Sequence, residues 1–266
     1  MLAERLRSAV GWLELLAFTG LWPAAVAAGL AAACGWTLDP GAAGGRLAPV
    51  LGLGVLGTLV VYNVDRLRDL EQDRLTAPQR SIFVLRHEKA LTLLCGASGL
   101  ACLPLALLLP AAAWGACGLA LVLGLFHRRL KANRPAAAVF YVTLAWLAVV
   151  VGIPAATLGA RPVAVLAAAS ALGPAIAANL VASELRGLPS SAAVGRRLRL
   201  GQWLALAGCL ASLLYAPTRP LVAIPLCAWA SLAGFRSSER YALIVLDGAL
   251  LAGALMALAW ALALGG

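Results

Sequence analysis

The sequence contains few charged side chains. Asp, Glu, Lys and Arg make up 12% of its 266 residues, whereas an ordinary soluble domain carries about 25%. Hydrophobic residues make up 62%, and the mean hydropathy is +0.91. This composition excludes a soluble globular enzyme, a disordered chain and a small disulfide-stabilised secreted module. A chain this apolar has to fold in lipid, where only helices and closed barrels satisfy every backbone polar group.

The sequence also lacks the alternation of apolar and polar residues that is typical of transmembrane β-strands. Its apolar runs are instead about 20 residues long, which is the length that a helix needs to cross a bilayer core. No two cysteines have the Cys-x-x-Cys spacing, and all six lie in or beside apolar segments. We therefore interpret them as buried apolar thiols rather than as metal ligands or disulfides.

These runs predict an all-α polytopic membrane protein in which nine transmembrane helices form a single bundle. Residues 1–266 then make one membrane domain. The expected helices cover 10–34, 47–64, 89–108, 111–127, 136–156, 162–182, 200–216, 220–235 and 241–263. A short turn at Leu109 and Pro110 separates the third and fourth helices, and a count of eight would follow if these two were one helix.

The basic residues are distributed unevenly over the loops that this helix count defines. Of the 21 Lys and Arg residues, 18 fall on one side of the membrane and three (Arg46, Arg161 and Arg219) on the other. Because cytoplasmic loops are enriched in Lys and Arg, we expect a cytoplasmic N-terminus in the cell (inner) membrane. The same rule accounts for the net charge of +10, so we expect the lipid bilayer and no nucleic acid as a partner.

Acidic residues recur where the second expected helix leaves the apolar region. Asp65, Asp69 and Asp73 are four residues apart, and neighbours at this spacing share one face of a helix. One interpretation is a solvated helix end that neighbouring arginines neutralise. The other is a row of oxygen ligands for Mg²⁺, which proteins usually share with substrate phosphates.

Two of the three asparagines lie near the cytoplasmic ends of expected helices. Asn63 and Asn179 precede long loops, at about 65–88 and 183–199, and each is followed by the pattern Leu-Arg-x-Leu. This likeness suggests two related half-sites. An amide at membrane depth requires a partner, so each asparagine either forms an interhelical hydrogen bond or lines a cavity. The intramembrane acid Asp247 has the same two alternatives.

These residues and this topology resemble the UbiA superfamily of intramembrane prenyltransferases. That family has nine transmembrane helices and two Asp-rich cytoplasmic loops, after its second and sixth helices. Its first motif is Asn-Asp-x-x-Asp-x-x-x-Asp, and Asp65, Asp69 and Asp73 reproduce the four-residue spacing. Pro78 and Arg80 match the end of the Asn-Arg-Pro-x-Arg stretch that often follows.

The second expected loop departs from the family pattern. Between Asn179 and Ser191 the sequence contains no aspartate, and Glu184 is the only acid. Gly187 and Ser191 stand where the resemblance leads us to expect carboxylates. This departure counts against catalysis and favours a relative of the family that has lost its catalytic activity.

The resemblance implies a prenyltransferase that moves a prenyl group from a prenyl diphosphate to an aromatic or other lipidic acceptor. It implies that Mg²⁺ is the cofactor and that Asp65, Asp69 and Asp73 are its ligands and the catalytic residues. The substrate-binding residues that it implies are Asn63, Arg68, Arg80, Lys131, Tyr141, Asn179, Glu184 and Arg186. The alternative is a catalytically degenerate relative that binds an isoprenoid or a partner protein. A transporter fits less well, because transporters place polar groups near the midplane of the membrane.

Overall fold

The computed structural model of the chain describes residues 12, 14–41, 45–71, 74, 77–133 and 137–265, and only the backbone of 127–133 and 264–265. Throughout these residues the secondary structure is helical, with no strands, which confirms the predicted all-α class. In this part of the chain, six helices are long and apolar enough to cross a membrane. They are α2 (Leu21–Leu38), α3 (Ala48–Arg68), α5 (Pro78–Leu107), the composite helix Ala138–Leu158, α9 (Pro162–Ser183) and Tyr241–Ala263.

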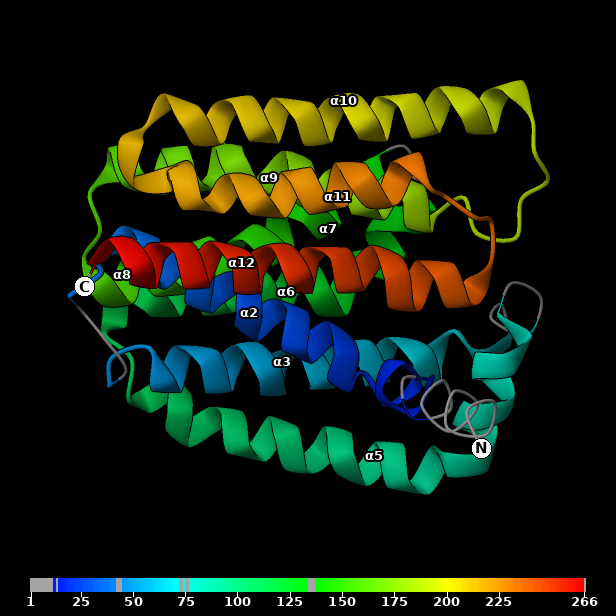
Figure 1. Cartoon of the computed structure of the whole chain (residues 1–266). Helices are drawn as coiled ribbons and strands as arrows, with labels where there is room; N and C mark the ends of the chain where they lie inside the picture. The colour runs from blue at the N-terminus through cyan, green and yellow to red at the C-terminus, as the bar shows by residue number, and fades with distance from the viewer. Residues whose placement is uncertain are drawn as a thin grey trace, which may run out of the picture.

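Two of these helices contain a wider π-helical turn. The composite helix consists of α7 (Ala138–Leu147), η2 (Ala148–Gly152) and α8 (Ile153–Leu158), and the last helix consists of η4 (Tyr241–Leu246) and α12 (Asp247–Gly265). The other helices are α6 (Ala111–Asn133), α10 (Ala192–Leu214), the 3₁₀ segment η3 (Ala216–Val222) and α11 (Ala223–Ala233). Figure 1 shows them side by side in one elongated bundle.

The main core lies where α2, α9, α11 and α12 meet, and it consists largely of alanine, leucine and valine. Small residues allow the helices to approach closely there. A Cβ atom on Gly208 of α10 would lie 2.8 Å from the carbonyl oxygen of Ala171 in α9, and one on Gly253 would lie 2.6 Å from the Cα of Ile224. Glycine at these two positions therefore allows the helix backbones to lie close together.

Large apolar side chains also cover the outside of the bundle. Leu93 and Leu100 of α5 and Leu214 of α10 are more than two-thirds exposed, as is Trp203. A water-soluble monomer rarely exposes a continuous apolar surface of this kind. Together with the six long apolar helices, this exposed apolar surface indicates a membrane protein.

The described basic residues gather at one end of the bundle. This end contains the C-terminal ends of α3, α9 and α11 and the beginnings of α5, α10 and η4, and it lies on the right in Figure 1. We call it the basic end. Arg46, Arg161 and Arg219 lie in the connections at the opposite end. The alternating direction of the helices therefore produces the charge segregation that the sequence predicts.

Three expected boundaries were wrong. The first expected helix, 10–34, is interrupted at Gly20, whose φ of +84° belongs to the left-handed region that glycine adopts without strain. The expected loop 65–88 is helical from Pro78 onward, and a kink at His87 divides α5. The expected loop 183–199 ends at Ser191, because its hydroxyl accepts a hydrogen bond from the Val194 N–H and caps α10.

Candidate functional site

The basic end of α3 holds the end of the preceding helical segment in place. Residues 14–19 are helical, and the chain turns at Gly20 before α2 begins. Arg66 donates from Nη1 to the Phe18 carbonyl oxygen at 2.5 Å and from Nη2 to the Ala17 carbonyl oxygen at 2.9 Å. Asn63 donates from Nδ2 to the Thr19 carbonyl oxygen at 3.1 Å. These are carbonyls that a helix C-terminus leaves without partners, and a cation there also complements the helix dipole.

Asn63 and Arg66 are nearly inaccessible, with exposed fractions of 0% and 3%. Asn63 Nδ2 also donates to Leu59 O in its own helix, at 2.8 Å. The Arg66 guanidinium lies 5.6 Å from the centre of the Tyr62 ring, an arrangement that stabilises a desolvated cation. The interhelical hydrogen bond expected of Asn63 is confirmed, and the residue serves packing at this point.

A second polar group connects α9 to the junction of η4 and α12. Asn179 donates from Nδ2 to the Asp247 Oδ1 at 3.1 Å and to the Leu246 carbonyl oxygen at 3.4 Å. The Ser183 hydroxyl donates to Asn179 Oδ1 at 3.2 Å. Both the nitrogen and the oxygen of the amide therefore form hydrogen bonds. Of the two alternatives left open for Asn179 and Asp247, the structure shows the interhelical hydrogen bond.

The polar group at the end of α3 and the polar group between α9 and α12 interact electrostatically with each other. The Asp247 carboxylate interacts electrostatically with the guanidinium groups of Arg66 and Arg186. The Tyr62 hydroxyl is close enough to interact electrostatically with the charged groups of Asp65, Arg66, Arg186 and Asp247. The structure thus brings the ends of the second and sixth expected helices together with the beginning of the last. We call Tyr62, Asp65, Arg66, Asn179, Arg186 and Asp247 the polar cluster.

The expected row of three carboxylates is only partly described. Helix α3 ends at Arg68, and Asp69 leaves helical geometry at the C-cap, so the predicted continuous helical face is wrong beyond this point. The Asp69 N–H still bonds the Asp65 carbonyl oxygen at 2.8 Å, so these two residues lie one turn apart. Asp73 lies outside the described residues. No group of three acidic, histidine or cysteine side chains able to hold a metal occurs in the described parts of the chain.

The remaining expected site residues are spread over several places. Arg68 is exposed and donates to the Leu125 carbonyl oxygen of α6 at 3.4 Å, and Arg80 is buried in the first turn of α5. Tyr141 packs edge-on against Phe140, with ring centres 6.2 Å apart. Glu184 is exposed and Arg186 is half-buried in the turn after α9. Lys131 lies in α6, and its side chain is outside the described residues.

The loop after α9 has structural reasons for its departure from the resemblance. Gly187 has a φ of +72° and donates its N–H to the Ser237 carbonyl oxygen, while the Ser237 hydroxyl donates to Leu188 O at 2.7 Å. Ser191 is the cap of α10. Both positions at which carboxylates were expected therefore stabilise the connection between two helices, and neither offers a metal ligand.

Tyr62 and Arg66 were not among the predicted site residues, and the sequence left the role of Asp247 open. The spacing of Asn63 and Arg66, three residues apart, was a usable signal because it places both on one helix face. An arginine next to the apolar part of a helix must also find partners. The sequence could not predict the orientation of Tyr62, because this orientation depends on how α3 is rotated about its own axis.

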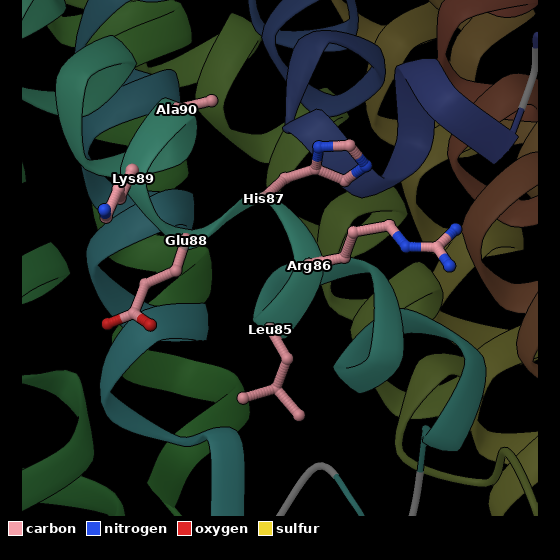
Figure 2. Close-up of a pocket in the computed structure, with 6 residues that line it drawn as sticks. All are labelled: Leu85, Arg86, His87, Glu88, Lys89 and Ala90. Carbon is pink, nitrogen blue, oxygen red and sulfur yellow. The ribbon is translucent and has the colours of Figure 1, made fainter.

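A separate hollow of about 340 Å³ lies at the kink of α5 and is lined by residues 85–90. Figure 2 shows Arg86 and Lys89 extending to opposite sides of the kink, with His87 at the break in the helix. The His87 ring packs against Phe83 at 4.5 Å between ring centres. Because the charged side chains diverge, this hollow offers no convergent set of ligands, and the polar cluster is the stronger candidate.

Comparison with protein-family models, with curated proteins and with solved structures gave no match to this chain. The polar cluster is therefore the strongest indication of function in the described parts of the chain.

Proposed function

We propose that the chain crosses the cell (inner) membrane nine times, with its N-terminus in the cytoplasm. The six long apolar helices support this count, together with the antiparallel α6, α10 and α11 that join them. The gathering of basic residues at one end supports the orientation. A periplasmic reporter enzyme fused at the C-terminus should be active, and the same reporter inserted after Leu188 should be inactive. Equal activity of the two fusions would contradict the proposed topology.

Within this topology, we infer that the chain is an intramembrane prenyltransferase. The observation that carries the proposal is the convergence of α3, α9 and α12 in the polar cluster at the basic end. A prenyl diphosphate has an apolar tail and an anionic head, and it would extend its tail among apolar helices with its head at this end. Arg68, Arg80, Lys131 and Arg186 would supply positive charge to the diphosphate, and Tyr141 would face the prenyl or acceptor group.

The acidic side chains fit a Mg²⁺ ion shared with the substrate. Mg²⁺ is usually held by one or two carboxylates together with substrate phosphates, and Asp65 and Asp69 provide two carboxylates one turn apart. Asp73 would be the third. When bound, such an ion would neutralise charge on the departing diphosphate. The residues themselves would orient the diphosphate, and the surrounding apolar helices would exclude water from the allylic cation that remains.

A second candidate is a membrane protein that binds a prenyl diphosphate, an isoprenoid or a partner protein without catalysis. The observation that favours it is the loop after α9, in which Gly187 adopts a left-handed turn and Ser191 caps α10, so that neither position supplies a carboxylate. A protein of this kind would retain a diphosphate and release no pyrophosphate.

Pyrophosphate release by the purified protein in lipid nanodiscs separates the two candidates. The assay supplies a pool of prenyl diphosphates and cell-extracted lipid acceptors, with Mg²⁺ or with EDTA. Release that requires Mg²⁺ supports the transferase, and Mg²⁺-dependent retention without release supports the binding protein. Neither release nor retention would overturn both candidates.

Asp69→Asn tests the metal role within the same assay. We expect it to abolish Mg²⁺-dependent retention of the diphosphate while expression and helicity stay unchanged, because an amide is a much weaker Mg²⁺ ligand than a carboxylate. Glu71→Gln is the matched control. Glu71 lies two residues after Asp69, is exposed, and forms an ion pair with Arg74. If Asp69→Asn retained the diphosphate as well as Glu71→Gln does, the metal role of Asp69 would be wrong.

A further inference from the structure

Asp247 is an acid inside a candidate transmembrane helix, and the structure turns it toward the inside of the bundle. It follows directly after the π-helical turn η4, and turns of this kind occur often at functional sites. Its carboxylate accepts the hydrogen bond from Asn179 of α9 and interacts with the charges of Arg66 and Arg186. An ionisable residue at this depth is costly unless it has such partners, and it usually has a function.

A purely structural tie between α9 and α12 would not require a carboxylate. Asn179 donates one hydrogen bond to Oδ1, and the oxygen of an asparagine or glutamine would accept it equally well. Arg66 does not need the carboxylate for its hydrogen bonds either, because both of its Nη atoms already donate to the carbonyls of Ala17 and Phe18. The hydrogen bonds of Asn179 and of the two Arg66 Nη atoms therefore do not by themselves require a carboxylate at position 247.

The Asp247 side chain is also not sealed inside the protein. Its residue is partly exposed, whereas Leu246 and Leu250 beside it are buried. Helix α3 packs mainly on α5 and α2 rather than on α9 or α12. Tyr62 and Arg66 of α3 nevertheless interact electrostatically with Asp247, at the end where Asp65 and Asp69 lie.

We propose, on the basis of the function proposed above, that Asp247 accepts the proton that the acceptor loses during prenyl transfer. In this step the bond between the prenyl carbon and the diphosphate oxygen breaks, and its electron pair leaves with the diphosphate. An electron pair of the acceptor forms the new bond to the prenyl carbon, and the proton displaced from the acceptor moves to a carboxylate oxygen of Asp247. The geometry places the Asn179 amide on one oxygen of this carboxylate, Oδ1, and no hydrogen bond within the described residues occupies the other. Asp65 and Asp69 would serve the diphosphate, and Asp247 would serve the acceptor.

Asp247→Asn tests this division because it removes the basic group and keeps an oxygen for Asn179. The variant and the parent are compared in nanodiscs with radiolabelled prenyl diphosphates, a total lipid extract and Mg²⁺. We expect prenylated lipid to form about a hundredfold more slowly, the size of effect usual for loss of a general base. Retention of the diphosphate should be no weaker than in the parent, since the substitution removes a negative charge near Arg66 and Arg186. Asp247→Glu should restore part of the transfer.

Asn179→Ala is the matched control for a merely structural role. It breaks the hydrogen bond between α9 and α12 but keeps the carboxylate of Asp247. A structural role predicts that this variant loses as much transfer as Asp247→Asn, whereas our proposal predicts that Asp247→Asn loses far more.

Each outcome decides one of the two proposals. Transfer by Asp247→Asn at the parent's rate, or equal losses in Asp247→Asn and Asn179→Ala, would overturn the role of Asp247 and leave the transferase standing. A parent that neither releases pyrophosphate nor forms prenylated lipid would overturn the transferase and this role with it.

Discussion

Asn63 and Asn179 lie at equivalent places in the bundle and have different partners. Each is buried in the last two turns of a long apolar helix at the basic end, and each precedes the pattern Leu-Arg-x-Leu. Asn63 donates only to backbone carbonyls, those of Leu59 and Thr19. Asn179 donates to a carboxylate as well as to a carbonyl, and it accepts from a hydroxyl. Similar sequences have therefore produced one structural contact and one contact with an ionisable group.

The proposed function divides the roles at the basic end along this difference. On the α3 side, Asn63 and Arg66 are committed to the end of the segment 14–19, and the acids Asp65 and Asp69 lie just beyond them. On the α9 side, Asn179 holds the only acid of the polar cluster that comes from the last transmembrane segment. A rigid α3 end and a chemically active α9–α12 contact are what this comparison predicts, and substitutions on each side can test it.

The largest effect should come from Arg66→Ala. This variant leaves the carbonyls of Ala17 and Phe18 without their partners in a buried place. Hydrogen bonds to charged groups contribute about 1.5–3 kcal/mol each, so we expect a loss of about 3 kcal/mol in the free energy of unfolding. Unfolding by SDS in mixed micelles measures this loss, and hydrogen exchange over residues 14–20 should accelerate.

Arg74→Ala is the control for Arg66→Ala, since Arg74 is exposed and its Nη1 lies 3.5 Å from Oε1 of the exposed Glu71. An exposed pair of this kind contributes little to stability. The rigid role of the α3 end would be wrong if the two variants unfolded at the same SDS concentration and exchanged alike over residues 14–20.

A smaller effect should distinguish the two asparagines themselves. Asn63→Ala removes an amide that forms two hydrogen bonds, and Asn179→Ala removes one that forms three. Interhelical bonds of this type contribute about 0.6 kcal/mol on average. We expect both variants to lose about 1 kcal/mol on unfolding in mixed micelles. Only Asn63→Ala should accelerate hydrogen exchange over 14–20, and only Asn179→Ala should do so over the turn 241–246. Identical exchange patterns would show that the two contacts are not independent.

Much of this arrangement follows from the sequence, because long apolar runs in lipid have few alternatives to helices. The turn at Leu109 and Pro110 follows from the boundary between two such runs. The segregation of the basic residues follows from the alternating direction of the helices. The break at Gly20 was not, since a glycine in an apolar run is compatible with a continuous helix until neighbouring carbonyls find partners such as Arg66. The meeting of Asp247 with Asn179 depends on the rotation of two almost uniformly apolar helices, and their periodicity contains no information about it.

The smallest effect concerns Ser183, whose hydroxyl donates to Asn179 Oδ1. This bond fixes which end of the amide faces Asp247, because a reversed amide would place its oxygen against the carboxylate. Ser183→Ala removes one neutral hydrogen bond in a partly exposed turn, so we expect a loss of about 0.5 kcal/mol or less in mixed micelles. The Nδ2 bonds to Asp247 and Leu246 should hold the amide in place without it, and exchange over 241–246 should stay at the parent's rate. If Ser183→Ala instead matched Asn179→Ala in both measurements, the hydroxyl would be the group that orients the amide, and the contact between α9 and α12 would depend on three residues rather than two.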